Sequence, residues 1–181
     1  MKITGSKLRQ VESDLGIGVP FIKGQVLKVK NCWHFCTDGN AVDCLFYDED
    51  DFRDGMNRVF IVLKKYNIII LSFCLMDTHV HFILYGSFDQ CNKFVHEFVR
   101  RTSEAISLKH GDRGKALNLP ISHQEITDEI YLKTAICYTI KNPPYGGLPF
   151  NAWDYPWSSL DDDRKRKKEL SENTPHLHNK R

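Results

Sequence analysis

Two short apolar runs in the middle of the chain limit the possible folds more than any other feature. NIIILSFCLM (67–76) and HVHFILYG (79–86) are separated only by Asp77 and Thr78. Runs of this length, rich in Ile and Phe and joined by two polar residues, predict two strands with a turn at or near residues 77–78. The rest of the chain must therefore supply the elements that cover a sheet built around these strands.

Amphipathic helices are expected on both sides of this strand pair. The segment 47–66 opens with acidic residues, which suit the positive N-terminal end of a helix. Its apolar residues recur at intervals of three and four, at Phe52, Met56, Val59, Phe60 and Leu63. Residues 89–110 repeat this pattern and predict a second helix. Residues 127–142 predict a third, with Thr127 or Asp128 as N-cap and Pro143 and Pro144 as its stop.

A strand is also expected early in the chain, because QVLKVKNCWHFCT (25–37) alternates in part and is rich in β-forming residues. GDRGKALNLPIS (111–122) reads as a loop that includes a short strand. The element order is then β-α-β-β-α-(β)-α, which predicts an α+β fold with helices packed on an antiparallel sheet. The 181 residues of the chain are expected to form one domain with an addition at each end, namely a leader at 1–24 and a disordered polar tail at 161–181.

Charge and hydropathy narrow the class of protein. No apolar stretch reaches the roughly 18 residues of a membrane span, and the N-terminus shows no apolar signal core, so we expect a cytoplasmic protein with no membrane partner. The net charge of +2 comes entirely from residues 161–181, with seven Lys/Arg against five Asp/Glu, while residues 1–160 are neutral. A nucleic acid would therefore be met by local basic patches, because there is no global basic field.

Six cysteines are present without a CxxC pair, which favours buried thiols over disulfides. Cys32, His34 and Cys36 alternate on the predicted first strand and would share one face. They leave open a soft-metal site, although no fourth ligand is evident.

Two motifs carry the candidate chemistry. His79 and His81 lie two residues apart on a predicted strand, so both side chains face the same way and could share one divalent ion. Two core histidines, each bonded to a carbonyl, are the alternative. Tyr138 and Asn142 lie four residues apart on the third predicted helix, so their side chains lie together. A phenol with a pKa of about 10 becomes a nucleophile only when a metal or base helps to remove its proton. Local packing of Tyr138 and helix termination by Asn142 are the alternative.

Taken together, MDTHVHFIL, YTIKNPP and DYPWSS resemble the single-tyrosine HUH transposases, the IS200-like group that includes the REP-associated tyrosine transposases. The resemblance covers roughly residues 25–160. In that family a strand HxH is followed by a helix bearing Tyr and, four residues later, Asn or Gln. An NPxxxGL segment and an aromatic YPWSS segment follow, as they do here at 142–148 and 155–159.

This resemblance implies a ferredoxin-like sheet of the HUH-nuclease type, with the catalytic tyrosine on the C-terminal helix. It implies a transposase-like transesterase that cleaves and rejoins single-stranded or hairpin DNA through a 5′-phosphotyrosine. Tyr138 would be the nucleophile, and His79, His81 and Asn142 would hold Mg²⁺ or Mn²⁺. Gln124, expected near the start of the tyrosine helix, is a poorer amide ligand because it lies fourteen residues from Tyr138.

The sequence also departs from the family. Asp77 and Thr78 replace a usual Pro-Asn, the basic residue of NPVKAGL is missing from NPPYGGL, and the Gly- and Arg-containing strand before the tyrosine helix is absent. These departures concern the DNA contacts more than the chemistry. The candidate DNA-binding residues are Arg100, Arg101, Lys109, Arg113, Lys115, Lys133 and Lys141. Tyr155 and Trp157 either stack on unpaired bases or pack their loop against the core, and packing is expected.

Three alternatives remain open from the sequence. The chain is an active tyrosine transposase or a domesticated relative, a non-catalytic DNA-binding module with the same fold, or an α+β protein whose histidines are only structural. The tyrosine helix could act within its own chain or be exchanged in a homodimer.

Overall fold

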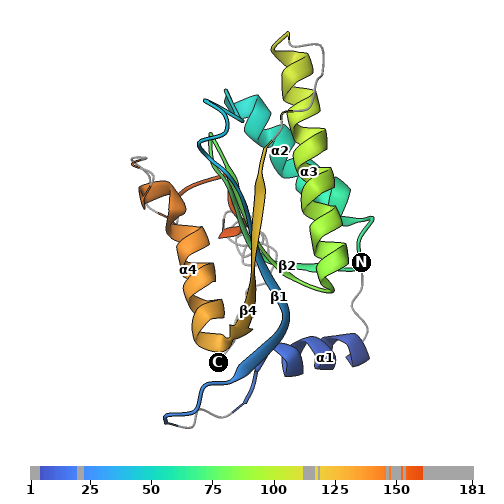
Figure 1. Cartoon of the computed structure of the whole chain (residues 1–181), viewed down its shortest axis with the longest axis vertical. Coiled ribbons are helices and arrows are strands. Elements are labelled where there is room, and N and C mark those ends of the chain that lie inside the picture. Colours follow the sequence, from blue (N-terminus) through green and yellow to red (C-terminus); the bar gives the residue numbers. More distant parts are fainter. Residues whose placement is uncertain are drawn as a thin grey trace, which may run out of the picture.

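The computed structural model describes residues 5–19, 23–111, 117, 119–145, 147, 152 and 154–160. The described residues form an α+β fold with a four-stranded antiparallel sheet and four helices (Figure 1). The elements in chain order are α1 Gly5–Leu15, β1 Lys28–Thr37, α2 Glu49–Leu63, β2 Ile69–Leu75, β3 Val80–Tyr85, α3 Phe88–Lys109, β4 Ile121–Asp128 and α4 Glu129–Tyr145. The predicted fold class is therefore confirmed.

The strands lie in the order β2-β3-β1-β4, so the first and third strands are central. With α2 between β1 and β2 and α3 between β3 and β4, this is the ferredoxin-like βαββαβ arrangement. The register places His81 of β3 opposite Cys36 of β1 and Cys74 of β2. Because directly opposed residues share a face, the side chain of His81 lies on the same face as the even-numbered residues of β1.

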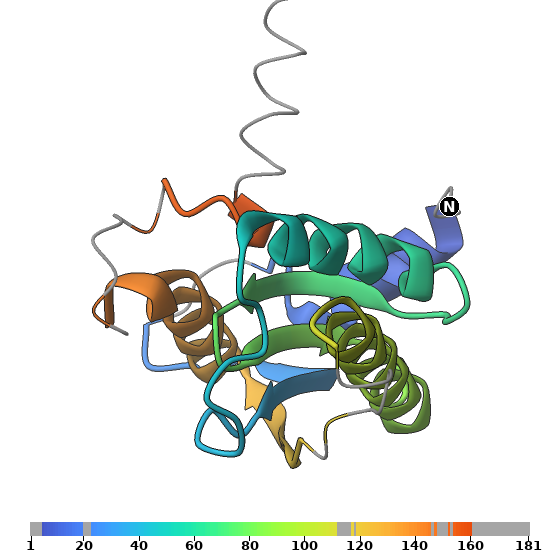
Figure 2. The same ribbon diagram turned by 90° about the horizontal axis from the view of Figure 1, so that it is seen from above.

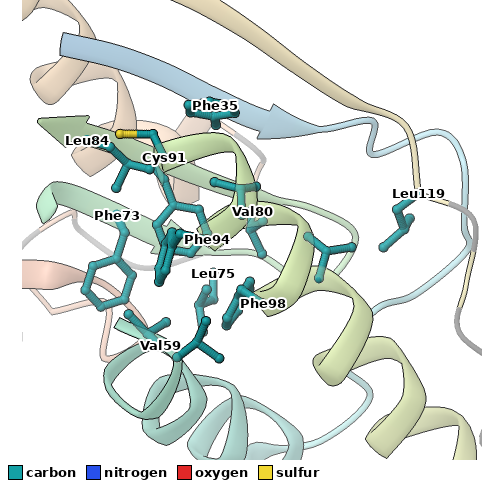
Figure 3. Packing of buried hydrophobic residues seen from close by; sticks show 14 of the residues in the cluster. Phe35, Val59, Phe73, Leu75, Val80, Leu84, Cys91, Phe94, Phe98 and Leu119 are labelled. Carbon is teal, nitrogen blue, oxygen red and sulfur yellow. The ribbon is translucent and has the colours of Figure 1, made fainter. Parts of the chain in front are cut away.

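The face toward α2 and α3 holds the larger hydrophobic core. Val80, Phe82 and Leu84 of β3 are fully buried there against Phe94 and Phe98 of α3. Figure 3 shows this packing, with Val59 of α2 closing the cluster from the other side. Helices α2 and α3 each bury one apolar face, as the spacing of three and four in the sequence predicted. Phe60 of the predicted α2 face is nevertheless 40% exposed, whereas Val62 is buried.

The opposite face is covered by α4 and, at the end of the sheet, by α1 (Figures 1 and 2). A smaller core lies here, in which Val11 and Leu15 of α1 and Leu132 and Ala135 of α4 contact buried strand residues. The Tyr85 hydroxyl donates to the Asp14 carboxylate at 2.7 Å, which ties α1 to β3. The segment expected as a leader thus contributes a helix to the packed domain.

Several predicted boundaries differ from the structure, and those of β4 and α4 bear on the site. Strand β4 is longer than the short strand expected at 111–122 and begins at Ile121. The sequence did not predict its full extent, because β4 is an edge strand of mostly exposed polar residues and lacks an apolar alternation. Gln124 consequently lies on β4 and not at the start of the tyrosine helix. No helix of the described ranges is long and apolar enough to cross a membrane.

The third predicted helix is present but ends three residues later than expected. Asp128 caps its start, since the backbone N–H of Tyr131 donates to the Asp128 carboxylate at 2.8 Å. Pro143 and Pro144 were expected to stop the helix at residue 142, yet α4 continues through both to Tyr145. Both prolines lie in the last turn, where they weaken the helical hydrogen bonding without reaching the turns that carry Tyr138.

Candidate active site

His79 and His81 lie together at the start of β3, on the face covered by α4. His81 is buried, with only 5% of its surface exposed, and His79 is half-buried just before the strand. Their ring centroids are 5.0 Å apart and the rings are nearly perpendicular. The strand alternation has therefore placed both imidazoles on one face, as the HxH spacing predicted.

Asn142 of α4 lies between the two imidazoles. Its Oδ1 is 3.2 Å from Nε2 of His79, and its Nδ2 is 3.0 Å from Nε2 of His81. Asn142 is 95% buried, so its amide is committed to this pair and does not merely end the helix in solvent. Two imidazole nitrogens and one amide oxygen, from the start of β3 and from α4, thus lie together as possible metal ligands.

Each imidazole is also held from behind through its second ring nitrogen. Nδ1 of His79 is 2.9 Å from the Thr78 hydroxyl, and Nδ1 of His81 is 3.1 Å from Nε2 of His34 on β1. Gly39 approaches this corner closely, because a Cβ at that position would lie 3.0 Å from Nδ1 of His79 and 3.1 Å from the Thr78 hydroxyl. A larger residue at position 39 would push against the Thr78–His79 pair.

All three histidines are held in the neutral form. Burial, together with the nearby His79 and His34 imidazoles, lowers the pKa of His81 to about 3. Burial likewise lowers the pKa of His34, and it lowers that of His79 against the opposing effect of a hydrogen bond that Asn142 Oδ1 accepts. A neutral imidazole keeps a nitrogen lone pair, which is the form that binds a metal ion.

Tyr138 lies one helical turn before Asn142, and its ring packs on the histidines. The ring centroid is 5.5 Å from that of His81 and 6.3 Å from that of His34, with edge-on geometry in both pairs. Tyr138 nevertheless remains 45% exposed. It lines a surface hollow of about 370 Å³ together with Lys133, Thr134, Cys137 and Lys141. The phenol therefore lies between the imidazole pair and an open surface within a single chain.

The predicted DNA-binding residues separate into two groups. Lys133 and Lys141 line the hollow beside Tyr138. Lys133 forms an ion pair with Glu129 at 2.6 Å, whereas Lys141 has no ion pair with any residue that the structure describes. Arg100, Arg101 and Lys109 lie on α3, across the sheet from α4, and are paired with Glu104, Glu97 and the carboxylates of Asp48 and Asp51. Arg113 and Lys115 lie outside the described residues.

A second cluster with metal-binding chemistry joins the start of α2 to the end of α3. Asp48, Asp51 and His110 bring ligand atoms within 4.8 Å of one another, so they form a candidate metal site that the sequence did not predict. The Lys109 ammonium group already supplies a positive charge to this cluster, since its Nζ lies 2.8 to 2.9 Å from oxygens of both carboxylates. The cluster therefore acts as an ion-pair junction between two helices without any added ion.

The aromatic segment after α4 packs on the protein. Tyr155 is buried and its hydroxyl donates to the Leu75 carbonyl at 2.7 Å, while Trp157 stacks on Phe52 with centroids 5.2 Å apart. Packing, the expected alternative, is thus confirmed for this loop.

Sequence reasoning placed His34 on the correct face but in a different role. It grouped His34 with Cys32 and Cys36 as possible soft-metal ligands. In the structure Cys32 is buried in the smaller core with a thiol pKa raised to about 12, and His34 contacts His81 instead. The alternation of the strand was the available signal, but the pairing of β1 with β3 was needed to show which residue His34 meets.

Comparison with solved structures identifies a protein of the same fold. A REP-associated tyrosine transposase bound to a REP hairpin matches with a TM-score of 0.57 at 15% identity, covering 82% of this chain and 87% of that one. A candidate transposase from Deinococcus radiodurans R1 matches with a TM-score of 0.37 at 14% identity, covering 68% and 97%. No family model and no curated protein matches the sequence. The chain therefore shares the fold of the REP-associated tyrosine transposase.

Proposed function

We propose that this protein is a metal-dependent, transposase-like transesterase that cleaves and rejoins single-stranded DNA through a 5′-phosphotyrosine on Tyr138. One observation carries the proposal: the partly exposed ring of Tyr138 packs edge-on against His81, and the neutral imidazoles of His81 and His79 are bridged by the amide of Asn142 on the same helix. The shared fold with a transposase bound to hairpin DNA supports hairpin-containing strands as the substrate class.

The donor set fits a small divalent cation. Two ligands at about 2.1 Å from a metal and at right angles to each other are about 3 Å apart, which matches the 3.2 Å between Oδ1 of Asn142 and Nε2 of His79. His79, His81 and the Asn142 carboxamide oxygen would hold Mg²⁺ or Mn²⁺. When bound, the ion supplies charge stabilisation to a phosphate oxygen and lowers the barrier to removing the phenol proton.

The residues of the chain perform the remaining tasks. Tyr138 is partly exposed on α4 and lines the hollow, so a phosphate lying there can approach its oxygen in line. The Tyr138 oxygen forms a bond to phosphorus as the bond from phosphorus to the 3′ oxygen breaks. The phenol proton passes to water, and the leaving 3′ oxygen takes up a proton from water. The reverse step, in which another 3′-hydroxyl attacks the phosphotyrosine, rejoins the strand. It needs no external energy source, because each step exchanges one phosphate ester bond for another.

The basic residues of the hollow hold the strand. Lys141 and Lys133 lie on the same surface of α4 as Tyr138 and can balance the charge of a bound phosphate. Electrostatic help is needed there because the C-terminal end of a helix carries partial negative charge and repels anions.

Covalent capture tests the proposal. Wild type is incubated with Mn²⁺ and a set of hairpin-containing strands labelled at either end, and adducts are separated under denaturing conditions. We expect an adduct that carries the 3′-end label and not the 5′-end label, because the protein becomes attached to the 5′ phosphate of the downstream fragment. Tyr138→Phe should abolish it.

Tyr47→Phe is the matched control, because Tyr47 is similarly exposed and stacks on His110 of the other cluster. It should form the adduct at the wild-type rate. An adduct that persists in Tyr138→Phe would exclude this residue as nucleophile. Hairpin binding by wild type without any adduct across the whole set would instead indicate a non-catalytic DNA-binding module.

A further inference from the structure

We infer that His34 is a positioning residue that holds the His81 ring with its Nε2 lone pair directed at the metal-binding point. The inference rests on the proposed function for the identity of that point. It is carried by a contact between two strands: Nε2 of His34 on β1 lies 3.1 Å from Nδ1 of His81 on β3, across 47 residues of sequence.

The geometry excludes His34 as a third ligand of the same ion. It contacts the Nδ1 side of His81, whereas Asn142 contacts the Nε2 side of that ring. These nitrogens lie on different sides of the imidazole, so His34 stands behind His81 as seen from the bridging amide. A group in that place acts on the ion only through the ring that it holds.

Hydrogen-bond bookkeeping then determines the roles of the rings. A neutral imidazole has one N–H donor and one acceptor nitrogen, and a carboxamide has one acceptor oxygen and one donor nitrogen. Because Asn142 bridges both Nε2 atoms, one imidazole must donate to the amide and the other must accept from it. With Oδ1 toward His79, Nε2 of His79 donates and Nε2 of His81 accepts.

The chain of donors then runs in one direction. The Thr78 hydroxyl donates to His79, His79 donates to Asn142, Asn142 donates to His81, and Nδ1–H of His81 donates to Nε2 of His34. His34 is the terminal acceptor. It therefore keeps the His81 proton on Nδ1, so the Nε2 lone pair that accepts from Asn142 is the one that would bind the ion. His79 would bind the same ion through Nε2 once its own proton moves to Nδ1, toward the Thr78 hydroxyl.

His34 is itself fixed from two sides. Its backbone pairs with Ile83 of β3 and Gln124 of β4, which places it in the centre of the sheet. The Tyr138 ring lies against His34 as well as His81. The same side chain thus supports one metal-binding imidazole and one edge of the ring proposed as nucleophile.

Two measurements test this role without relying on activity. Proton–nitrogen correlation spectra of the full chain with labelled histidine report which nitrogen of His81 is protonated, and His81→Gln identifies its signals. Titration with Mn²⁺ alone, followed by electron paramagnetic resonance, gives the affinity. We expect wild-type His81 to carry its proton on Nδ1, and His34→Ala to lose this preference and bind Mn²⁺ about 10- to 100-fold more weakly.

Two further variants make the result specific. His34→Gln restores an acceptor oxygen near Nδ1 and should recover most of the lost affinity, which a purely structural role would not explain. His96→Ala removes an exposed histidine of α3 and should behave as wild type. Thermal melts confirm that each variant is folded.

The outcomes separate this inference from the proposed function. If wild type does not bind Mn²⁺ at all, the metal-dependent function fails, while the protonation of His81 still decides the role of His34. If wild type binds Mn²⁺ and His34→Ala binds it equally well, the inference is overturned. A wild-type His81 protonated on Nε2 would overturn it too.

Discussion

The two faces of the sheet are built from alternate residues of the same strands, yet they differ in chemistry. On the face toward α2 and α3, β3 presents Val80, Phe82 and Leu84 to a continuous hydrophobic core. On the face toward α4, the same stretch presents His79 and His81, and the buried amide of Asn142 on α4 contacts both imidazoles. One face provides the rigidity with which the other can hold a buried polar network in a fixed geometry.

The difference is sharpest along α4 itself. Its first half carries Leu132 and Ala135 into the smaller core, whereas its second half buries Thr139 and Asn142. The change from apolar to polar burial occurs about where the helix passes from the α1 end of the sheet to the histidines. The first half of the helix therefore anchors it on the sheet, and the second half carries the polar side chains of the candidate site.

Phe82 of β3 and His79, just before that strand, give the strongest test of this division. Phe82→Ala should lower the free energy of unfolding by about 3–5 kcal/mol, because Phe82 packs on Phe73, Phe94 and Phe98. His79→Ala should cost no more than about 1–3 kcal/mol while abolishing Mn²⁺ binding and adduct formation. Urea unfolding and covalent capture on the same samples measure both. Loss of adduct in folded Phe82→Ala, or a larger stability loss in His79→Ala, would break the comparison.

A pH-dependent effect is expected from Glu97, on the α2 and α3 side of the sheet. Hydrogen bonds from Lys65 and then Tyr66 lower the pKa of Glu97 to about 2. Since this pKa is below the unfolded value, Glu97 stabilises the fold fully above pH 4.5 and loses that contribution as pH falls toward 2.

Glu97→Gln should therefore cost on the order of 1 kcal/mol near neutral pH, and the difference from wild type should shrink between pH 4.5 and 2. Urea unfolding at several pH values measures it. Glu104→Gln, which removes a local pair with Arg100 on the same helix, serves as control and should cost less. A Glu97 effect that stays constant down to pH 3 would contradict this assignment.

The smallest expected effect distinguishes the two faces as DNA surfaces. Lys141→Gln should weaken binding to a single-stranded hairpin and reduce the slope of log affinity against log salt by about 0.7. Arg100→Gln on α3 should leave the slope unchanged, because Arg100 is paired with Glu104 on the other side of the sheet from Tyr138. Fluorescence anisotropy at several salt concentrations measures both. An equal loss in the two variants would mean that DNA contacts both faces.

The local patterns of the sequence predicted what depends on neighbours along the chain. Alternation in HVHFILYG was enough to put His79 and His81 on one face, and a spacing of four was enough to put Tyr138 beside Asn142. The helices at 47–66 and 89–110 followed from apolar spacing in the same way. Strand β4 did not, because an edge strand such as SHQEIT pairs through its backbone and buries little apolar surface.

What the sequence determined by itself is the set of chemical groups and the face of each element on which they lie. Only the tertiary structure decided that α4 crosses the sheet with Asn142 between the two imidazoles and that His34 of β1 stands behind His81. The physical reason is that strand register and helix docking depend on packing between residues far apart in the chain, which periodicity along one element does not encode.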